Sequence, residues 1–312
     1  MYDLIIIGAG VAGMTAAIVA NENGVNNILL IERDKSVGGL LNQCIHSGFG
    51  KSILKTEFTG PEYINVLSNK LNYHNINVKL ETEVLNVSDD KVVTYLNPDE
   101  GMRCVEAKSI ILASGCREQY TGSIEFESKN LLGIFTCEDA HRIINFEGYL
   151  PGKEPIITVS NKWDLFIVKR FIIEGAKVKS LIINTSENFK FTDEEQSIIS
   201  GMDVPFIIDG RIIQAIGDKR VEGIKIYDKH NNESTIIACD SLIMSVNHFP
   251  EIGYLKSNSI KANKKIKLHN YKTPIDGIFA CGNITYGSSV WKEKDIDGIE
   301  AGIEAAKYIS EL

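Results

Sequence analysis

The feature that most constrains the fold is a glycine-rich turn between an apolar strand and an alanine-rich helix. Residues 4–7 (LIII) form a continuous apolar run, which is typical of a strand buried on both faces of a parallel sheet. The run leads into Gly8-Ala9-Gly10-Val11-Ala12-Gly13, and residues 14–23 then predict a helix that Gly24 ends. A second apolar strand over residues 28–31 completes a strand–helix–strand unit.

The three glycines of this turn have separate physical roles in a dinucleotide-binding unit. Gly8 allows the tight turn, Gly10 leaves room for a pyrophosphate, and Gly13 lets the helix pack closely on the strand. The N-terminus of the helix offers unpaired N–H groups and the positive end of its dipole to the phosphates. Glu32 stands at the end of the second strand, roughly 20 residues after the turn, where a carboxylate accepts ribose hydroxyls. The unit therefore predicts a dinucleotide site.

Length and composition exclude several classes of protein and of partner. A chain of 312 residues predicts two domains, and 44% hydrophobic with 24% charged residues excludes a disordered chain. The net charge of -8 argues against a nucleic-acid or anionic-membrane partner, because phosphate binding needs a basic surface. No leader and no membrane-spanning run is recognised, so we expect a cytoplasmic protein without membrane insertion. Six cysteines include no CxxC pair, so no metal site is predicted.

Further motifs carry a resemblance to a known family. Glu32 is followed by Gly38-Gly39, residues 110–115 (IILASG) form an apolar strand with small residues at its end, and residues 277–283 (GIFACGN) form another that closes on Gly-Asn. Together these motifs resemble the FAD-binding signatures of the pyridine nucleotide-disulfide oxidoreductase superfamily, and the length fits its thioredoxin-reductase-sized branch. The resemblance implies FAD as the cofactor. Asn283 stands where the family carries an aspartate beside the ribityl and pyrophosphate parts of FAD.

The glycine turn and the resemblance together imply a set of FAD-binding residues. They are Gly8, Gly10, Ala12, Gly13, Glu32, Arg33, Gly39, Leu40, Asn42, Val84, Ala113, Ser114, Gly115, Gly282, Asn283, Asp297 and Gly298. By the same resemblance, a C-terminal helix expected over residues 296–309 directs its N-terminus at the pyrimidine edge of the flavin.

A narrower resemblance concerns residues 38–50 (GGLLNQCIHSGFG), 59–63 (TGPEY) and 115–118 (GCRE). These strings are similar to flavoproteins that accompany anaerobic glycerol-3-phosphate dehydrogenase-type subunits. The similarity implies a dehydrogenase or electron-transfer protein subunit as a partner. Homodimers are common among relatives, so a homodimer is also expected.

The middle of the chain predicts a second strand–helix–strand unit with a different loop. Residues 155–159 and 178–183 read as strands and residues 165–174 as a helix, but residues 160–164 (SNKWD) contain no glycine and carry the large Trp163. The second strand ends in Asn-Thr at 184–185, without an acidic residue for a ribose. We therefore expect that ordinary NAD(P)H binding is lost. The alternative, that other loops supply nicotinamide binding, stays open.

These observations predict an α/β protein of two Rossmann-like three-layer domains. The FAD-binding domain is discontinuous, over residues 1–118 and 248–312, and an NAD(P)-binding-like domain is inserted over residues 119–247.

The predicted function is an FAD-dependent oxidoreductase. It passes electrons between its flavin and a partner protein or a small redox molecule, without ordinary NAD(P)H binding. A disulfide reductase needs two thiols close enough to bridge, and no such pair is written locally, so a dithiol disulfide reductase is not expected. Cys44 with His46 is the candidate catalytic pair, as a low-pKa thiol near the flavin, while a buried and inert Cys44 is the alternative. Two other functions stay open: an NAD(P)H-dependent flavin reductase with an atypical loop, and a non-catalytic FAD-bound subunit or redox sensor.

Overall fold

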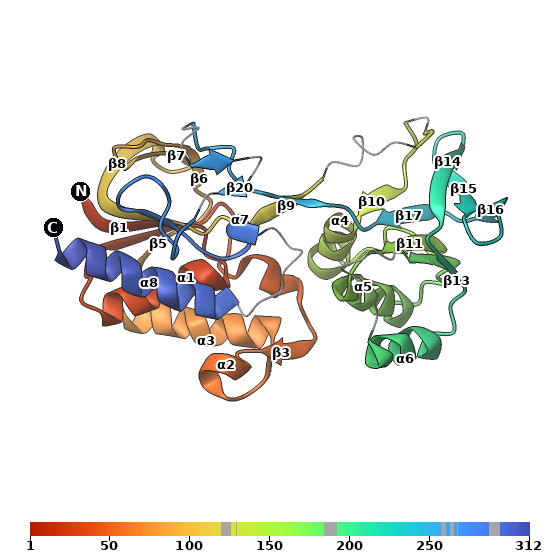
Figure 1. Cartoon of the computed structure of the whole chain (residues 1–312), viewed down its shortest axis with the longest axis horizontal. Coiled ribbons are helices and arrows are strands. Elements are labelled where there is room, and N and C mark those ends of the chain that lie inside the picture. The colour runs from red at the N-terminus through yellow and green to blue at the C-terminus, as the bar shows by residue number, and fades with distance from the viewer. Residues whose placement is uncertain are drawn as a thin grey trace. The chain divides into compact units, whose positions relative to one another are not determined.

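A computed structural model describes residues 1–119, 126–128, 130–183, 192–256, 260–262, 265–266, 268–286 and 294–312 (Figure 1). Its contacts divide the chain into two compact units. Unit 1 contains Met1–Arg117 and His248–Leu312, and unit 2 contains Glu118–Asn247. No helix in these described ranges is both long enough and apolar enough to cross a bilayer.

Unit 1 is an α/β unit. Its helices are α1 (Val11–Glu22), α2 (Lys51–Leu54), α3 (Gly60–Tyr73), α7 (Asn283–Tyr286), α8 (Lys294–Ser310) and the 3-10 turn η1 (Gly39–Gln43). Its strands are β1 (Tyr2–Ile7), β2 (Ile28–Ile31), β3 (Ser47–Phe49), β4 (Phe58–Thr59), β5 (Asn77–Lys79), β6 (Glu83–Val87), β7 (Val92–Asn97), β8 (Gly101–Leu112), β9 (Cys116–Glu118, which crosses the unit boundary), β18 (His248–Pro250), β19 (Lys261–Ala262), β20 (Lys265–Ile266) and β21 (Ile278–Ala280).

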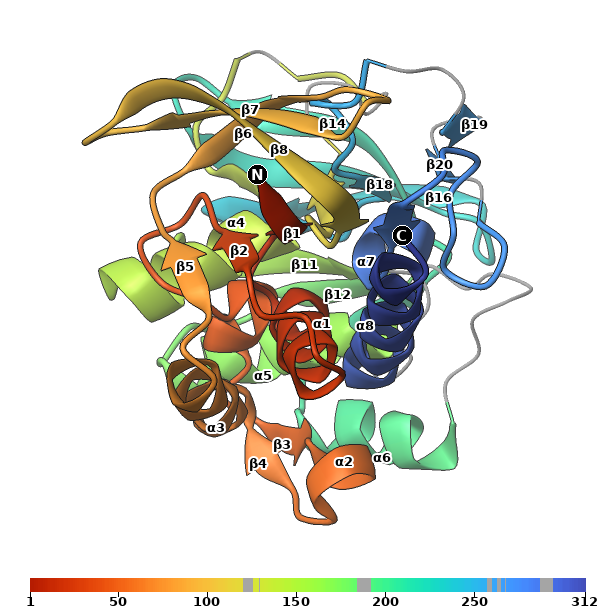
Figure 2. The same cartoon turned by 90° about the vertical axis from the view of Figure 1, so that its left-hand side faces the viewer.

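The central sheet of unit 1 has the strand order β5-β2-β1-β8-β7-β6, with β21 also paired to β8. Strands β5, β2, β1, β8 and β21 run parallel, whereas β6, β7 and β8 form an antiparallel meander. Helices α1, α3 and α8 cover one face of the parallel part (Figure 2). A second buried cluster fills the opposite face, beneath the meander. The apolar runs at β1 and β2 are fully buried because both faces of the sheet are covered.

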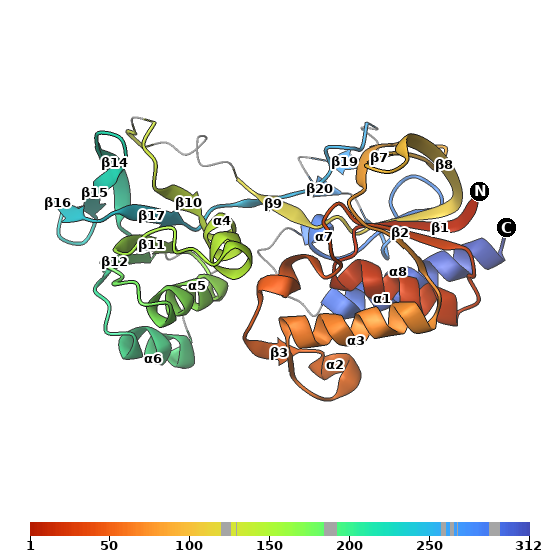
Figure 3. The same ribbon diagram turned by 180° about the vertical axis from the view of Figure 1, so that it is seen from behind.

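Unit 2 is also built on a parallel sheet. Its elements are β10 (Ile134–Thr136), α4 (Cys137–Arg142), the π-helical turn η3 (Ile143–Glu147), β11 (Pro155–Val159), α5 (Lys162–Ile173), β12 (Ser180–Ile183), α6 (Asp193–Gly201), β13 (Phe206–Ile208), β14 (Arg211–Gly217), β15 (Val221–Asp228), β16 (Glu233–Ala238) and β17 (Ser241–Met244). The sheet order is β10-β17-β11-β12-β13, with every pair parallel. Helices α4 and α5 pack on one face, and the antiparallel sheet β14-β15-β16 packs on the other (Figure 3).

The α/β class with Rossmann-like sheets is confirmed. Several bounds differ from the expected ones. Helix α1 begins at Val11 rather than residue 14, and α5 at Lys162 rather than 165, because Gly10 and Asn161 already serve as N-caps. The strand expected over 110–115 ends at Leu112 and begins as early as Gly101. The antiparallel sheet β14-β15-β16 was not predicted, and the expected strand end at 184–185 lies outside the described residues.

Helices α1 and α8 approach so closely that two glycines of α8 have no room for a side chain. A Cβ on Gly298 would overlap the Ala12 carbonyl oxygen, and one on Gly302 would lie 2.7 Å from the Ala16 carbonyl oxygen. Because both obstacles are backbone atoms, neither can rotate away. The two helices run side by side in Figure 2. Their packing depends on small residues, as the interleaved Gly and Ala of α8 suggest.

We expect Gly302→Ala to destabilise the protein by about 1–3 kcal/mol, the usual cost of overpacking. Urea unfolding would measure it. Gly201→Ala is the matched control, because a Cβ there would meet no atom within 4 Å. Equal stability of the two variants would contradict the close packing of α8 on α1.

Candidate functional site

The glycine turn after β1 is shaped by contacts between backbone atoms. Gly8 has φ +104°, and a Cβ on it would overlap the Ala113 carbonyl oxygen at the end of β8. A Cβ on Gly13 would overlap the Gly8 carbonyl oxygen. These two glycines are therefore required by the approach of α1 to β1 and β8. They form the turn.

Gly10 differs from its neighbours because its surroundings are open. A Cβ on Gly10 would meet no atom within 4 Å. Gly10 is the N-cap of α1, no side chain caps the helix, and its first turn holds no acidic residue. The helix N-terminus thus presents backbone N–H groups and a positive dipole end to an open space. This arrangement fits the pyrophosphate of FAD.

Segments distant in sequence meet at this N-terminus. A Cβ on Gly39 would lie 3.4 Å from the Gly10 Cα, and one on Gly282 would lie 2.9 Å from the Ala12 Cβ. Gly298 packs on the Ala12 carbonyl oxygen, as described above. The structure therefore brings together Gly10, Ala12, Gly39, Gly282 and Gly298. Asn283 follows as the first residue of α7.

Glu32 supports the turn through its carboxylate. One oxygen accepts the Ala9 N–H at 2.7 Å and the other accepts the Asp34 N–H at 3.0 Å. Burial raises the pKa of Glu32, and the two backbone donors oppose that rise. Each carboxylate oxygen keeps a second lone pair, so a ribose hydroxyl can still donate to it. The neighbouring Arg33 is half exposed and pairs with Glu251 at 3.4 Å.

The remaining predicted residues lie on other elements of unit 1, and Val84 packs in the cluster on the opposite face of the sheet. Asn42 donates to the Val37 carbonyl at 2.7 Å and so closes the Gly38–Gly39 turn. Leu40 lies in η1 and Val84 in β6. Ala113, Ser114 and Gly115 follow β8, and Gly115 takes a left-handed φ of +74°.

Ser114 is tied to a residue that the sequence did not point to. Its hydroxyl donates to the Glu251 carbonyl at 2.9 Å, so the buried Tyr254 hydroxyl at 2.7 Å is its donor. Burial raises the pKa of Tyr254, which keeps that phenol protonated. Asp297 is likewise held by an unpredicted tyrosine, since the Tyr271 hydroxyl lies 3.4 Å from its Oδ1.

Cys44 does not have the lowered pKa that was expected. The thiol is only 5% exposed, and burial raises its pKa to about 12. It donates weakly to the Leu40 carbonyl at 3.6 Å. The pKa of His46 is lowered, mainly by burial, so the imidazole is neutral at pH 7. The expectation of a thiolate at Cys44 is wrong for this conformation, because desolvation outweighs every favourable contact of the anion.

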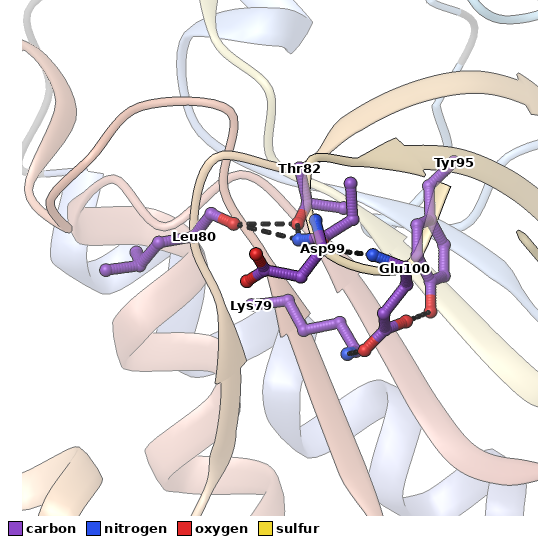
Figure 4. Close-up of polar contacts among 7 residues, drawn as sticks. Lys79, Leu80, Thr82, Tyr95, Asp99 and Glu100 are labelled. Carbon is purple, nitrogen blue, oxygen red and sulfur yellow. Dashed lines mark hydrogen bonds and ion pairs between the residues drawn. The ribbon is translucent and has the colours of Figure 1, made fainter. Parts of the chain in front are cut away.

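A polar cluster beside the β7–β8 hairpin was also missed (Figure 4). The Glu100 carboxylate pairs with the Lys79 ammonium and accepts the Tyr95 hydroxyl at 3.0 Å. Asn97 donates to Thr82 at 2.8 Å and accepts the N–H groups of residues 99 and 100. The cluster holds the turn of the meander against β5. We assign it a structural role because its polar groups bond to one another.

In unit 2, the loop after β11 is occupied by its own side chains. The Asn161 Oδ1 accepts the N–H groups of Trp163 and Asp164 at 2.9 and 3.3 Å. The Asp164 Oδ2 accepts the N–H groups of Ser160 and Asn161 at 2.7 and 3.0 Å. This capping box satisfies donors that a glycine loop would leave for a pyrophosphate. Burial raises the pKa of Asp164 to about 6.

Two further titratable groups, the partly exposed Glu118 and the buried Cys137, lie near the carboxyl edge of the unit 2 sheet. Glu118 accepts the Glu138 N–H at 2.9 Å, and burial raises its pKa to about 8. Cys137 is buried close enough to Glu118 and Asp164 for both to raise its pKa, although burial is the larger cause. Carboxyl ends of parallel strands are the usual ligand sites of such sheets. Buried titratable groups at this edge mark it as the candidate site of unit 2.

Comparisons with known proteins place this geometry in a wider context. The pyridine nucleotide-disulphide oxidoreductase family model matches residues 2–148. Over its full length the chain is 22% identical to a thioredoxin reductase of Mycolicibacterium smegmatis and covers 97% of that protein. The match of residues 2–148 to this family supports FAD as the cofactor.

Solved structures show a likeness over both units. Lactococcus lactis thioredoxin reductase in its FR conformation has a TM-score of 0.80 at 20% identity, over 100% of both chains. The bacillithiol disulfide reductase of Bacillus cereus has a TM-score of 0.75 at 15% identity, over 99% of both. At such identities the likeness concerns the fold. The fold of the chain is thioredoxin-reductase-like.

The comparisons contradict two expectations. We expected a protein without ordinary NAD(P)H binding and one that is not a dithiol disulfide reductase, whereas the full-length relatives are named thioredoxin reductase. Both expectations rested on short strings: the loop at 160–164 and the strand end at 184–185 for the nucleotide, and the lack of a CxxC pair for the disulfide. Loops vary more than the scaffold that carries them, so a changed loop is a poor guide to the loss of a ligand.

The burial of Cys44 predicts slow chemistry with thiol reagents. We expect the neutral, 5% exposed thiol to react with iodoacetamide at least tenfold more slowly than Cys104, which is exposed. Mass spectrometry of labelled peptides at several times would measure both rates in one sample. Faster labelling of Cys44 than of Cys104 would contradict the burial seen here.

Proposed function

We propose that the protein is an FAD-containing reductase that uses NAD(P)H, with the flavin held in unit 1 and the nicotinamide nucleotide in unit 2. The observation that carries the proposal is the meeting of Gly10, Ala12, Gly39, Gly282 and Gly298 at the uncapped N-terminus of α1. The full-length likeness to thioredoxin reductases supports the use of NAD(P)H.

Unit 1 would hold FAD mainly through its backbone. The N–H groups at the start of α1 would bind the pyrophosphate, and Glu32 would accept ribose hydroxyls. Asn283 would donate or accept at the ribityl hydroxyls without adding charge. When bound, FAD supplies the capacity to accept a hydride and to release electrons to an acceptor. The residues of the chain bind and orient it, and the Asp297 carboxylate adds a charge nearby.

Unit 2 would bind the nicotinamide nucleotide through an atypical loop. The Asp164 carboxylate accepts the N–H groups of Ser160 and Asn161 just before α5, and the Asn161 amide accepts those of Trp163 and Asp164 at its start. A diphosphate that takes the N–H groups of Ser160 and Asn161 must displace the Asp164 carboxylate. Two negative groups then compete for the same donors. The affinity for the nucleotide therefore depends on the charge of Asp164.

The names of the relatives support a disulfide as the electron acceptor, on a small protein or a small molecule. An electron-transfer protein is the class of partner that we propose. A glycerol-3-phosphate dehydrogenase-type subunit is the finer prediction from residues 38–50, and the cytoplasm is the predicted location. Cys44 and His46 stay the candidate catalytic pair, with the burial of Cys44 requiring a change of conformation before its thiol can react.

Anaerobic titration of the purified yellow protein with NADH and NADPH tests the proposal. Bleaching of the flavin band by either nucleotide is the expected result. Turnover with a thioredoxin, a small disulfide or ferricyanide then identifies the class of acceptor. A protein that binds FAD but is reduced by neither nucleotide would overturn the nicotinamide part, and one without FAD would overturn the whole.

The charge of Asp164 predicts a pH dependence of nucleotide binding. With a pKa of about 6, Asp164 is ionised at pH 7.5 and protonated at pH 5. Protonation removes a negative charge that competes with the diphosphate, so the Kd for NAD(P)H should fall as the pH is lowered through 6. Asp164→Asn should lower the Kd at pH 7.5 by about fivefold to tenfold and flatten this dependence, as expected for about 1 kcal/mol of repulsion.

The matched control for this prediction is Asp193→Asn, at the exposed start of α6. It removes the same charge from another helix start of unit 2. Equal effects of the two substitutions would point to net charge rather than to the capped loop. A weaker affinity in Asp164→Asn would show that the loop helps binding.

A further inference from the structure

Residues 269–276, here called the strap, run along α8 and contact it at three points. The Tyr271 hydroxyl lies 3.4 Å from the Asp297 Oδ1, and the Lys272 ammonium lies 3.2 Å from a Glu304 carboxylate oxygen. The Tyr308 hydroxyl donates to Asp276 at 2.6 Å. The three α8 residues are spaced by whole turns, so they lie on one face of the helix. The strap therefore holds α8 by its polar face, while its small residues pack on α1.

The turn of the strap carries a bulky residue where glycine is usual. Asn270 and Tyr271 have φ values of 49° and 63°, and His269 and Lys272 exchange two backbone hydrogen bonds at 3.0 Å. Two consecutive positive φ values define a primed turn, whose second position normally takes Gly. A tyrosine held there is strained, and strain of this kind gathers at functional sites. The contacts of the Tyr271 side chain should therefore explain why a tyrosine occupies this position.

The tyrosine hydroxyl reaches a buried carboxyl group beside the candidate FAD site. Asp297 is only 6% exposed and lies in the first turns of α8. The next residue, Gly298, packs on Ala12 in the first turn of α1. Asp297 thus places an acidic group at the positive end of α8, next to the residues that would bind FAD. A negative charge there opposes the gain of negative charge by the flavin on reduction.

We propose that Asp297 lowers the reduction potential of the bound flavin and that Tyr271 is the positioning residue that holds its carboxylate. The inference rests on one part of the proposed function, the binding of FAD by unit 1. It does not depend on the electron donor or acceptor.

The test measures the two-electron midpoint potential of the FAD-loaded protein against reference dyes. Asp297→Asn should raise the potential by roughly 30 mV, which is a tenfold change in the ratio of reduced to oxidised flavin. Tyr271→Phe keeps the ring and removes the hydroxyl, so it should shift the potential in the same direction by less. Tyr308→Phe removes an equivalent hydroxyl from the far end of the strap and should leave the potential unchanged.

A second variant separates positioning from folding. Tyr271→Gly relieves the left-handed strain and also removes the hydroxyl, so it should shift the potential as Tyr271→Phe does without lowering the unfolding temperature. An unchanged potential in Asp297→Asn, or an equal shift in Tyr308→Phe, would overturn the proposal. Loss of FAD from both Asp297→Asn and Tyr271→Phe would also overturn it, since the pair would then serve binding. Wild-type protein without FAD would instead refute the proposed function.

Discussion

The approach of the α1 backbone to the ends of β1 and β8 is the constraint on which the rest of unit 1 depends. Gly8 and Gly13 have no space for a Cβ because carbonyl oxygens of Ala113 and Gly8 occupy it. The same approach sets the direction of α1, and its uncapped N-terminus then faces the open surroundings of Gly10. A side chain at Gly8 or Gly13 would move the helix and the candidate site together. The packing of the α1 backbone therefore determines where the candidate site lies.

The second half of the site depends on α8, which comes from the other end of the chain. Gly298 and Gly302 let α8 lie directly on the α1 backbone, and the strap holds a different face of the helix. The Lys272–Glu304 ion pair is weak by itself, since exposed ion pairs contribute about 0–1 kcal/mol, and the other two contacts are hydrogen bonds from tyrosine hydroxyls to carboxylates. Together with the close packing, they set the position of Asp297 and Gly298 relative to Ala12. Small residues therefore decide the location of the site, and polar contacts refine it.

Much of unit 1 could be predicted because its constraints are local. The strand β1, the glycine turn and the strand β2 follow one another closely in the sequence. The steric need for glycine at Gly8 and Gly13 can therefore be recognised from this short segment alone. Tyr254 and Tyr271 could not be predicted in the same way, because their partners Ser114 and Asp297 lie far away in the sequence. The raised pKa of Cys44 was missed for a related reason. Burial is set by the whole fold, and the neighbouring His46 is a poor guide to it.

Unit 2 shows why the absence of a binding motif is weaker evidence about function than its presence. A glycine turn has few uses other than a close approach, so its presence is informative. The loop at 160–164 has another way to satisfy the start of α5, through the side chains of Asn161 and Asp164. A ligand could replace these capping contacts, since a protonated Asp164 no longer competes as an anion. If unit 2 holds a nicotinamide nucleotide as proposed, the side chains that stabilise the helix would give way to it, and the lack of glycine would weaken its binding without preventing it.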